Sequence, residues 1–206
     1  MGKLGLVTVL YKSDNVLEGF FKSLSSQSFK DYHLYLIDNS PSAETDSLIE
    51  SFTNKYPVAG YTHVKNNKNT GVANGNNQGI ELSLKDNSDY VLLLNNDIEF
   101  YQPFLLDEMY KCAEQQNEDI IIPKIFYFGT RTIWMAGGHT SKSKAISSHV
   151  GVDKEDGPEY NAATHFDYAP TCFMLVSKKV FDAMACDDTS FIYSAASPPT
   201  SGSEER

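Results

Sequence analysis

The sequence YVLLLNNDIEF, residues 90–100, places a short apolar run directly before two asparagines and an aspartate. Such a run is typical of a strand that is buried on both faces, as in a parallel sheet covered by helices. Asn95, Asn96 and Asp97 then follow at the carboxyl end of that strand. Ligands of open α/β sheets bind at this edge, so we expect these three residues to meet a small molecule.

Two earlier apolar runs end in the same way. LGLVTVL, residues 4–10, is followed by Tyr11, and HLYLI, residues 33–37, is followed by Asp38, Asn39 and Ser40. Helical patterns separate the runs, which predicts an α/β fold with a mostly parallel sheet flanked by helices. Right-handed connections would bring the polar strand ends to one edge, where they can converge on one ligand.

The segment NKNTGVANGNNQGI, residues 67–80, has glycine at every fourth position, at 71, 75 and 79. If the segment is helical, these glycines lie along one face and each costs about 1 kcal/mol relative to alanine. Either the helix packs very closely on the sheet, or a ligand approaches the backbone here. The many asparagines in the segment favour the ligand, because amides are poor helix formers that offer neutral donors and acceptors.

The net charge of the chain and the motifs that it lacks exclude several classes of ligand. The formal net charge of −10 argues against nucleic acid as a partner, because phosphate backbones are bound mainly by Lys and Arg. A phosphorylated ligand would need a divalent cation, a helix N-terminus or a few placed lysines. No G-x-G-x-x-G follows the first strand and no phosphate-binding P-loop motif is present, which argues against NAD, FAD and P-loop chemistry.

Two carboxylates are candidate ligand contacts. Asp97 is a hard oxygen ligand that suits Mg²⁺ or Mn²⁺ when substrate phosphates complete the coordination shell. Asp38 can accept a hydrogen bond from a nucleobase or a ribose hydroxyl. Each also has a structural alternative, because Asp and Asn commonly stabilise turns and helix starts.

Beyond Gly129 the pattern changes to strands of mixed polarity, with a polar loop at residues 141–161 that we expect to lack regular structure. His139, His165 and Asp167 could face an acceptor or be structural. Trp134, the only tryptophan, could be a stacking platform, although a place in the core is favoured. We expect one domain over residues 1–193, with a first half at residues 1–128 and a second half at residues 129–193. A disordered tail is expected to follow at residues 194–206. No apolar run approaches a membrane span, which favours a cytoplasmic location.

Taken in order, VTVLYKS, LYLIDNS, NKNTGVANGNNQGI, YVLLLNNDIEF, YAPTCFMLVSKKVF and DDTSFIY resemble the family-2 inverting glycosyltransferases of GT-A fold. The resemblance covers residues 4 to about 193 and is greatest to the rhamnosyltransferase-like members that build bacterial surface polysaccharides. It implies a UDP- or dTDP-sugar donor and a saccharide or lipid-linked acceptor. It also implies Mg²⁺ or Mn²⁺ as cofactor and allows peripheral contact with the inner face of the membrane.

The resemblance also implies roles for individual residues. The nucleotide pocket would be lined by Thr8, Leu10 and Tyr11, and the base and ribose would be read by Asp38, Asn39 and Ser40. The donor would also contact Asn69, Gly71 and Asn77. The family's DXD-type motif would correspond to Asn95, Asn96 and Asp97, with Asp97 as the metal ligand.

The chain departs from the family pattern after FIY, residues 191–193. The family ordinarily continues with an aromatic residue and Glu-Asp, where the Asp is the general base, but this chain has Ser194, Ala195 and Ala196. Asp187 and Asp188 are weak substitutes for a base, so the catalytic residue stays unassigned and the chain is expected to be truncated or altered. A nucleotide-sugar-binding module without transfer activity is the alternative. A nucleotidyltransferase is a weaker alternative. That class needs a basic, glycine-rich loop after the first strand, and YKSDN at this place has little of that character.

Overall fold

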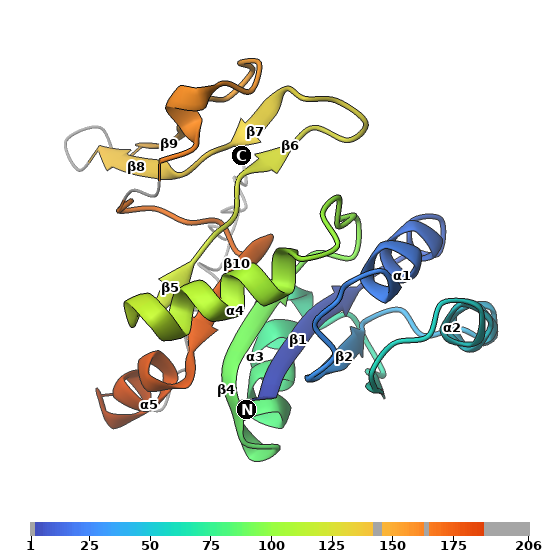
Figure 1. Ribbon diagram of the computed structural model, residues 1–206. Coiled ribbons are helices and arrows are strands. Elements are labelled where there is room, and N and C mark those ends of the chain that lie inside the picture. Colours follow the sequence, from blue (N-terminus) through green and yellow to red (C-terminus); the bar gives the residue numbers. More distant parts are fainter. Residues whose placement is uncertain (1–2, 142–145, 163–164, 188–206) are drawn as a thin grey trace, which may run out of the picture.

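The computed structural model describes residues 3–141, 146–162 and 165–187 (Figure 1). The first half contains β1 (Lys3–Leu10), α1 (Leu17–Ser25), β2 (Tyr32–Asp38), α2 (Ala43–Lys55), β3 (Tyr61–Lys65), α3 (Gly71–Lys85), β4 (Ser88–Leu94) and α4 (Leu105–Gln116). The second half contains β5 (Ile120–Ile121), β6 (Ile125–Phe126), β7 (Ile133–Met135), β8 (Gly138–Ser141), β9 (Ile146–His149), the 3₁₀ turn η1 (Pro158–Tyr160), β10 (Phe173–Ser177) and α5 (Lys178–Asp187).

The central sheet has six strands in the order β3-β2-β1-β4-β10-β5. The first four are parallel to one another, and β10 adds antiparallel to β4. The expected α/β fold with a mostly parallel sheet is therefore confirmed. Two antiparallel pairs, β6-β7 and β8-β9, form the smaller part, which Figure 1 shows on one side of the central sheet.

Helices cover both faces of the sheet because its central strands are apolar on both sides. One core contains side chains from α1, α2 and α4, such as Phe20, Ile49 and Leu106, packed against Leu6 and Leu92. The other core joins α3 and α5 to the opposite face of the sheet. Among the helices that the structure describes, none combines the length and the hydrophobicity needed to cross a membrane.

The sequence DIIIPKIFYF, residues 119–128, predicts a buried strand that is interrupted at Pro123. The interruption is present, but the prediction that the strand is buried is wrong. The segment divides into β5, which pairs with β10, and β6, which pairs with β7 in a different sheet. Pro123 lies between them and has no N–H to donate to a ladder, so the strand cannot continue through it. Ile120 is 49% exposed because β5 is the last strand of the sheet.

The second half is more regular than its composition suggests. The polar loop expected at residues 141–161 contains β9 and η1. Ile133 and Met135 of β7 are fully buried, whereas Trp134 between them points to the other side and is partly exposed. Alternation along a strand places successive side chains on opposite faces, so Trp134 is not part of the core that its two neighbours share.

Tyr35 gives a prediction for alkaline stability. The ring is buried under α3, and its hydroxyl donates to Asp86 Oδ2 at 2.6 Å. Burial and the Asp86 carboxylate raise the pKa of Tyr35 above its ordinary value of 10.0. The stability that this hydroxyl contributes is therefore present below about pH 10 and is lost as the pH rises further. Tyr35→Phe should cost about 1 kcal/mol at neutral pH and make the alkaline loss of stability shallower.

Urea unfolding of the wild type and Tyr35→Phe at pH 7.5 and at about pH 11 measures both effects. Tyr61→Phe, at a tyrosine that is 40% exposed, is the matched control and should follow the wild type. Equal alkaline slopes for the wild type and Tyr35→Phe would contradict the prediction.

Candidate functional site

The polar ends of the parallel strands meet at one edge of the sheet. Leu10 pairs with Asp38 and Asp38 pairs with Lys65, so β1, β2 and β3 end side by side. On the other side of β1, β4 runs parallel and ends before Asn95. The convergence expected from the sequence is therefore present, and we call this region the carboxyl edge.

Asp38 lies just below the surface of the carboxyl edge. Its side chain is fully buried, Oδ1 accepts a hydrogen bond from the backbone N–H of Ser40 at 2.8 Å, and Oδ2 lies 3.2 Å from His63 Nε2. The other ring nitrogen of His63 lies 3.7 Å from Asp46 Oδ1. In this conformation Asp38 shapes the turn after β2, as the structural alternative expects, and its role toward a base or ribose stays a prediction.

Asn39 joins three segments at this edge. Its Oδ1 accepts hydrogen bonds from Asn66 Nδ2 at 2.8 Å and from Thr70 Oγ1 at 3.0 Å, and its Nδ2 donates to the carbonyl of Gly71 at 3.2 Å. Asn66 also exchanges hydrogen bonds with Gln78 on α3. This amide network fixes the first turn of α3 against the ends of β2 and β3.

Helix α3 begins at the carboxyl edge. Asn69 Oδ1 accepts from the backbone N–H of Gly71 at 2.9 Å, and Gly71 has a φ of +80°, which favours glycine. A Cβ at Gly71 would meet no atom within 4 Å, whereas Cβ atoms at Gly75 and Gly79 would collide with Val9 and Val7. Close packing on the sheet thus explains the second and third glycines, and only the first faces open space.

The motif after β4, residues 95–97, exposes two of its three side chains. Asn95 and Asp97 are exposed, and Asn96 is partly buried with an Nδ2 that has no hydrogen-bond partner in the described residues. The backbone N–H of Asn95 donates to the carbonyl of Cys172 at 2.9 Å, which ties this motif to the start of β10. Burial raises the pKa of the Cys172 thiol, and the nearby Asp97 carboxylate raises it further.

A resident metal would depend strongly on Asp97. Residues 3–141, 146–162 and 165–187 contain no cluster of three or more His, Cys, Asp or Glu side chains that could hold an ion. One exposed carboxylate flanked by amides fits Mg²⁺ or Mn²⁺ only when ligand phosphates and water supply the remaining oxygens.

The other predicted site residues differ in accessibility. Thr8 and Leu10 are buried, and Thr8 Oγ1 has no partner among the described residues, while Tyr11 is 48% exposed. Ser40 is partly buried, and its hydroxyl accepts a hydrogen bond from the backbone N–H of Lys12. Asn77 has a buried Oδ1 without a described partner.

Among the candidate positions for a base, Asp187 is the last residue of α5, whereas Asp188 and Ala196 lie outside the described residues.

Sequence reasoning missed His63 and Thr70. His63 lies in the middle of β3, and only the pairing of β3 with β2 brings its ring to Asp38. Thr70 was part of the glycine-rich segment without being singled out. A pattern search for polar residues in the strand next to Asp38 would have found His63, but the partner strand had to be known first.

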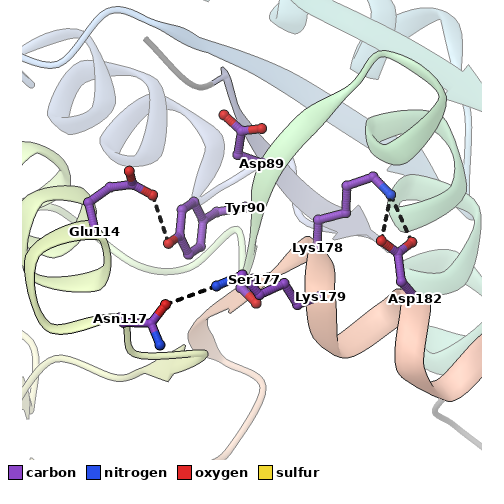
Figure 2. Close-up of a pocket in the computed structure, with 8 residues that line it drawn as sticks. All are labelled: Asp89, Tyr90, Glu114, Asn117, Ser177, Lys178, Lys179 and Asp182. Atoms are coloured by element: carbon purple, nitrogen blue, oxygen red, sulfur yellow. Dashed lines mark hydrogen bonds and ion pairs between the residues drawn. The ribbon is translucent and has the colours of Figure 1, made fainter.

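A hollow of about 470 Å³ lies away from the carboxyl edge, where β4 begins (Figure 2). It is lined by Asp89, Tyr90, Glu114, Asn117, Ser177, Lys178, Lys179 and Asp182. Its polar groups pair with one another, since Tyr90 donates to Glu114, Lys179 to Asn117 and Lys178 to Asp182. This internal pairing makes it a weaker candidate than the carboxyl edge.

Comparison with known proteins identifies the family of the chain. A family model described as Glycosyl transferase family 2 matches residues 6–184, which run from β1 into α5. The chain belongs to glycosyl transferase family 2. Homologues in this family transfer sugars, as the names of two relatives state.

Two relatives of the chain are longer than the chain itself. The low-salt glycan biosynthesis hexosyltransferase Agl10 of Haloferax volcanii is 26% identical over 189 residues, covering 91% of this chain and 57% of that protein. The cholesterol galactosyltransferase of Borreliella burgdorferi is 21% identical over 126 residues, covering 61% of this chain and 33% of that protein. The chain thus spans little more than half of the first relative and a third of the second.

Two solved structures share the fold of this chain. Mannosyltransferase PcManGT from Pyrobaculum calidifontis, in complex with GDP-Man and Mn²⁺, has a TM-score of 0.54 at 12% identity and covers 61% of this chain and 36% of that one. S. aureus TarS 1–349 in complex with UDP has a TM-score of 0.53 at 18% identity and covers 62% of this chain and 37% of that one. At such low identity the likeness shows the GT-A fold alone.

Proposed function

We propose that this chain binds a nucleotide-diphosphate sugar at the carboxyl edge and transfers the sugar, with inversion, to a saccharide or lipid-linked acceptor. The observation that carries the proposal is that β4, which leads into Asp97, ends at the same edge of the sheet as β2, and that the Asn39 network after β2 holds the first turn of α3. We further propose a UDP- or dTDP-sugar as donor and a role in building bacterial surface polysaccharide, in line with the rhamnosyltransferase-like motifs.

The groups at this edge suit a diphosphate. The N-terminus of α3 offers backbone N–H groups and the positive end of the helix dipole to an anion. Gly71 leaves open space beside that helix start, so a phosphate can approach the backbone there. Asn77 Oδ1 and Asn96 Nδ2 are buried without described partners, and a bound donor could satisfy both.

Asp97 would hold Mg²⁺ or Mn²⁺ together with the donor phosphates. When bound, the metal would neutralise charge on the departing diphosphate. This requirement is strong in a chain with a formal net charge of −10, because an unmasked diphosphate would be repelled.

Inverting transfer is a single displacement at the anomeric carbon. The acceptor hydroxyl forms the new C–O bond, the bond from the anomeric carbon to the diphosphate oxygen breaks, and a base takes the hydroxyl proton. By resemblance the base would stand at Ala196, whose side chain cannot accept a proton. Asp187 and Asp188 are the candidate replacements, and a missing base costs about 10² to 10⁴ in rate.

Isothermal titration of the full chain with UDP, dTDP and GDP, each with and without Mn²⁺, tests the binding half of the proposal. GDP is included because PcManGT was solved with GDP-Man. We expect at least one nucleotide to bind, and Mn²⁺ to tighten its binding by about 100-fold or more, which is about 2.8 kcal/mol. If none of the three binds with or without Mn²⁺, the proposed function is wrong.

Nucleotide-sugar binding without transfer is the second candidate, and Ala195 with Ala196 at the expected Glu-Asp favours it. Both candidates predict nucleotide binding. Mass spectrometry of a reaction with nucleotide sugar and a saccharide acceptor separates them, because only the transferase yields a glycosylated acceptor in addition to free nucleotide diphosphate.

A further inference from the structure

Three aromatic side chains form a row on the small antiparallel part of the molecule. They come from different segments: Trp134 from β7, His149 from β9 and Tyr168 from the segment before β10. The Trp134 and His149 ring centroids are 4.6 Å apart, and those of His149 and Tyr168 are 5.9 Å apart with the rings nearly parallel. All three are partly exposed, and we call them the aromatic row.

A buried tryptophan usually donates a hydrogen bond from its indole N–H, and Trp134 differs in this respect. His149 Nδ1 lies 3.2 Å from the Trp134 carbonyl oxygen, which fixes the two residues together. Within the described ranges, however, the structure gives the indole N–H of Trp134 no hydrogen-bond acceptor. A tryptophan with a partly exposed ring and an unpaired donor can pack on an apolar surface and donate to a polar group beside it.

Two glycines hold the third member of the row in place. A Cβ at Gly137 would lie 2.2 Å from the Phe166 ring. A Cβ at Gly138 would lie 2.5 Å from the Tyr168 ring and 2.8 Å from its carbonyl oxygen. The AGG sequence at the start of β8, residues 136–138, therefore leaves room for the side chains of Phe166 and Tyr168, and close packing holds the row together.

The row lies near the carboxyl edge. Tyr168 is four residues before Cys172, whose carbonyl accepts the hydrogen bond from the Asn95 N–H. Four residues of chain span at most about 14 Å, so the row is within the reach of a short saccharide from the DXD-like motif.

We infer that the aromatic row binds a sugar ring of the acceptor, an assignment that rests on the proposed function. A sugar ring has C–H groups on its faces, which pack on aromatic rings, and hydroxyls on its rim, which need hydrogen-bond partners. Each ring of the row also carries a polar group that can pair with a sugar hydroxyl, namely the indole N–H of Trp134, an imidazole nitrogen of His149 and the hydroxyl of Tyr168. The row thus offers an apolar face bordered by polar groups and suits a neutral saccharide.

Trp134 makes this inference directly measurable, because it is the only tryptophan in the chain. Its emission is recorded while the full chain is titrated with the methyl glycosides of glucose, galactose, mannose and rhamnose, alone and with UDP and Mn²⁺. At least one glycoside should shift or quench the emission. Saturation-transfer difference NMR measures the same binding in variants that lack tryptophan.

Trp134→Ala should weaken glycoside binding at least tenfold, whereas Trp134→Phe should stay within about threefold because it keeps a flat apolar ring. Phe128→Ala, at a side chain that is 79% exposed and outside the row, is the matched control and should bind as the wild type does. Nucleotide binding should be unchanged in all three variants.

The inference is overturned if no glycoside binds while the nucleotide does, or if Trp134→Ala binds glycosides as well as the wild type. Failure of the proposed function has a different signature, namely the absence of nucleotide binding. Circular dichroism of each variant confirms that the fold is retained. If Trp134→Ala does not fold, Tyr168→Ala replaces it, because it removes another ring of the row and keeps the tryptophan signal; it should weaken glycoside binding at least tenfold, and wild-type binding by Tyr168→Ala would then overturn the inference.

Discussion

Replacing Asp97 by alanine is expected to abolish the contribution of Mn²⁺ to nucleotide binding and to weaken binding in the presence of Mn²⁺ by about 100-fold or more, which is about 2.8 kcal/mol. Asp97 is the only carboxylate of the DXD-like motif, and the described residues offer no cluster of His, Cys, Asp or Glu that could hold the ion without it. Its removal should leave the diphosphate facing an acidic chain without a compensating charge.

Asp97→Asn keeps the shape of the side chain and removes its charge, so it should fall between wild type and Asp97→Ala. Glu99→Gln is the matched control, because Glu99 is an exposed carboxylate two residues further along. Calorimetry with UDP and Mn²⁺ compares the four proteins. Binding by Asp97→Ala at the wild-type level, or an equal loss in Glu99→Gln, would contradict the assignment of the metal to Asp97.

Gly79→Ala is expected to lower the free energy of unfolding by about 1 to 3 kcal/mol, even though alanine is about 1 kcal/mol better than glycine in a helix. A Cβ at position 79 would lie 2.2 Å from Val7 Cγ1, and Val7 is fully buried between the sheet and α3. The helix would have to move away from β1 to make room. Because α3 begins at the carboxyl edge, nucleotide binding should weaken as well.

Thermal and urea unfolding measure this effect, with about 2 to 4 °C in Tm expected for each kcal/mol. Glu81→Ala, at an exposed position of the same helix, is the control and should change stability by less than about 0.5 kcal/mol. In a Val7→Ala background the added methyl group has space, so Gly79→Ala should be nearly neutral there. A neutral or stabilising effect in the wild-type background would contradict close packing at this glycine.

The strand ends were predictable because their signal is local. An apolar run followed by Asp38 or by Asn95 indicates both a strand and its polar end within a few residues. The parallel direction of β1, β2, β3 and β4 follows from the helices between them, because crossover connections of this kind join parallel strands. The fold class and the carboxyl edge could therefore be inferred from the sequence.

Other features depend on residues that are far apart in the chain. The pairing of β10 with β4 joins segments separated by almost 80 residues, and no local pattern encodes it. The approach of His63 to Asp38 depends on strand pairing in the same way. The three-residue strand β7 is too short for alternation to show on which side Trp134 lies. The two explanations of the glycines could be separated only once Val7 and Val9 were seen beneath the helix.

The adjacency of β5 and β10 has a consequence for how such a molecule can be altered. Ile121 pairs with Leu175, so the chain leaves the central sheet and returns to it at neighbouring strands, about 4.8 Å apart. Residues 122–172 therefore form an insertion whose two ends are held by adjacent strands. The entropic cost of bringing the two ends of an insertion together grows only slowly with its length. We therefore expect that this insertion can be lengthened, shortened or replaced as a unit. The four parallel strands that present Asp38 and Asp97 would stay as they are.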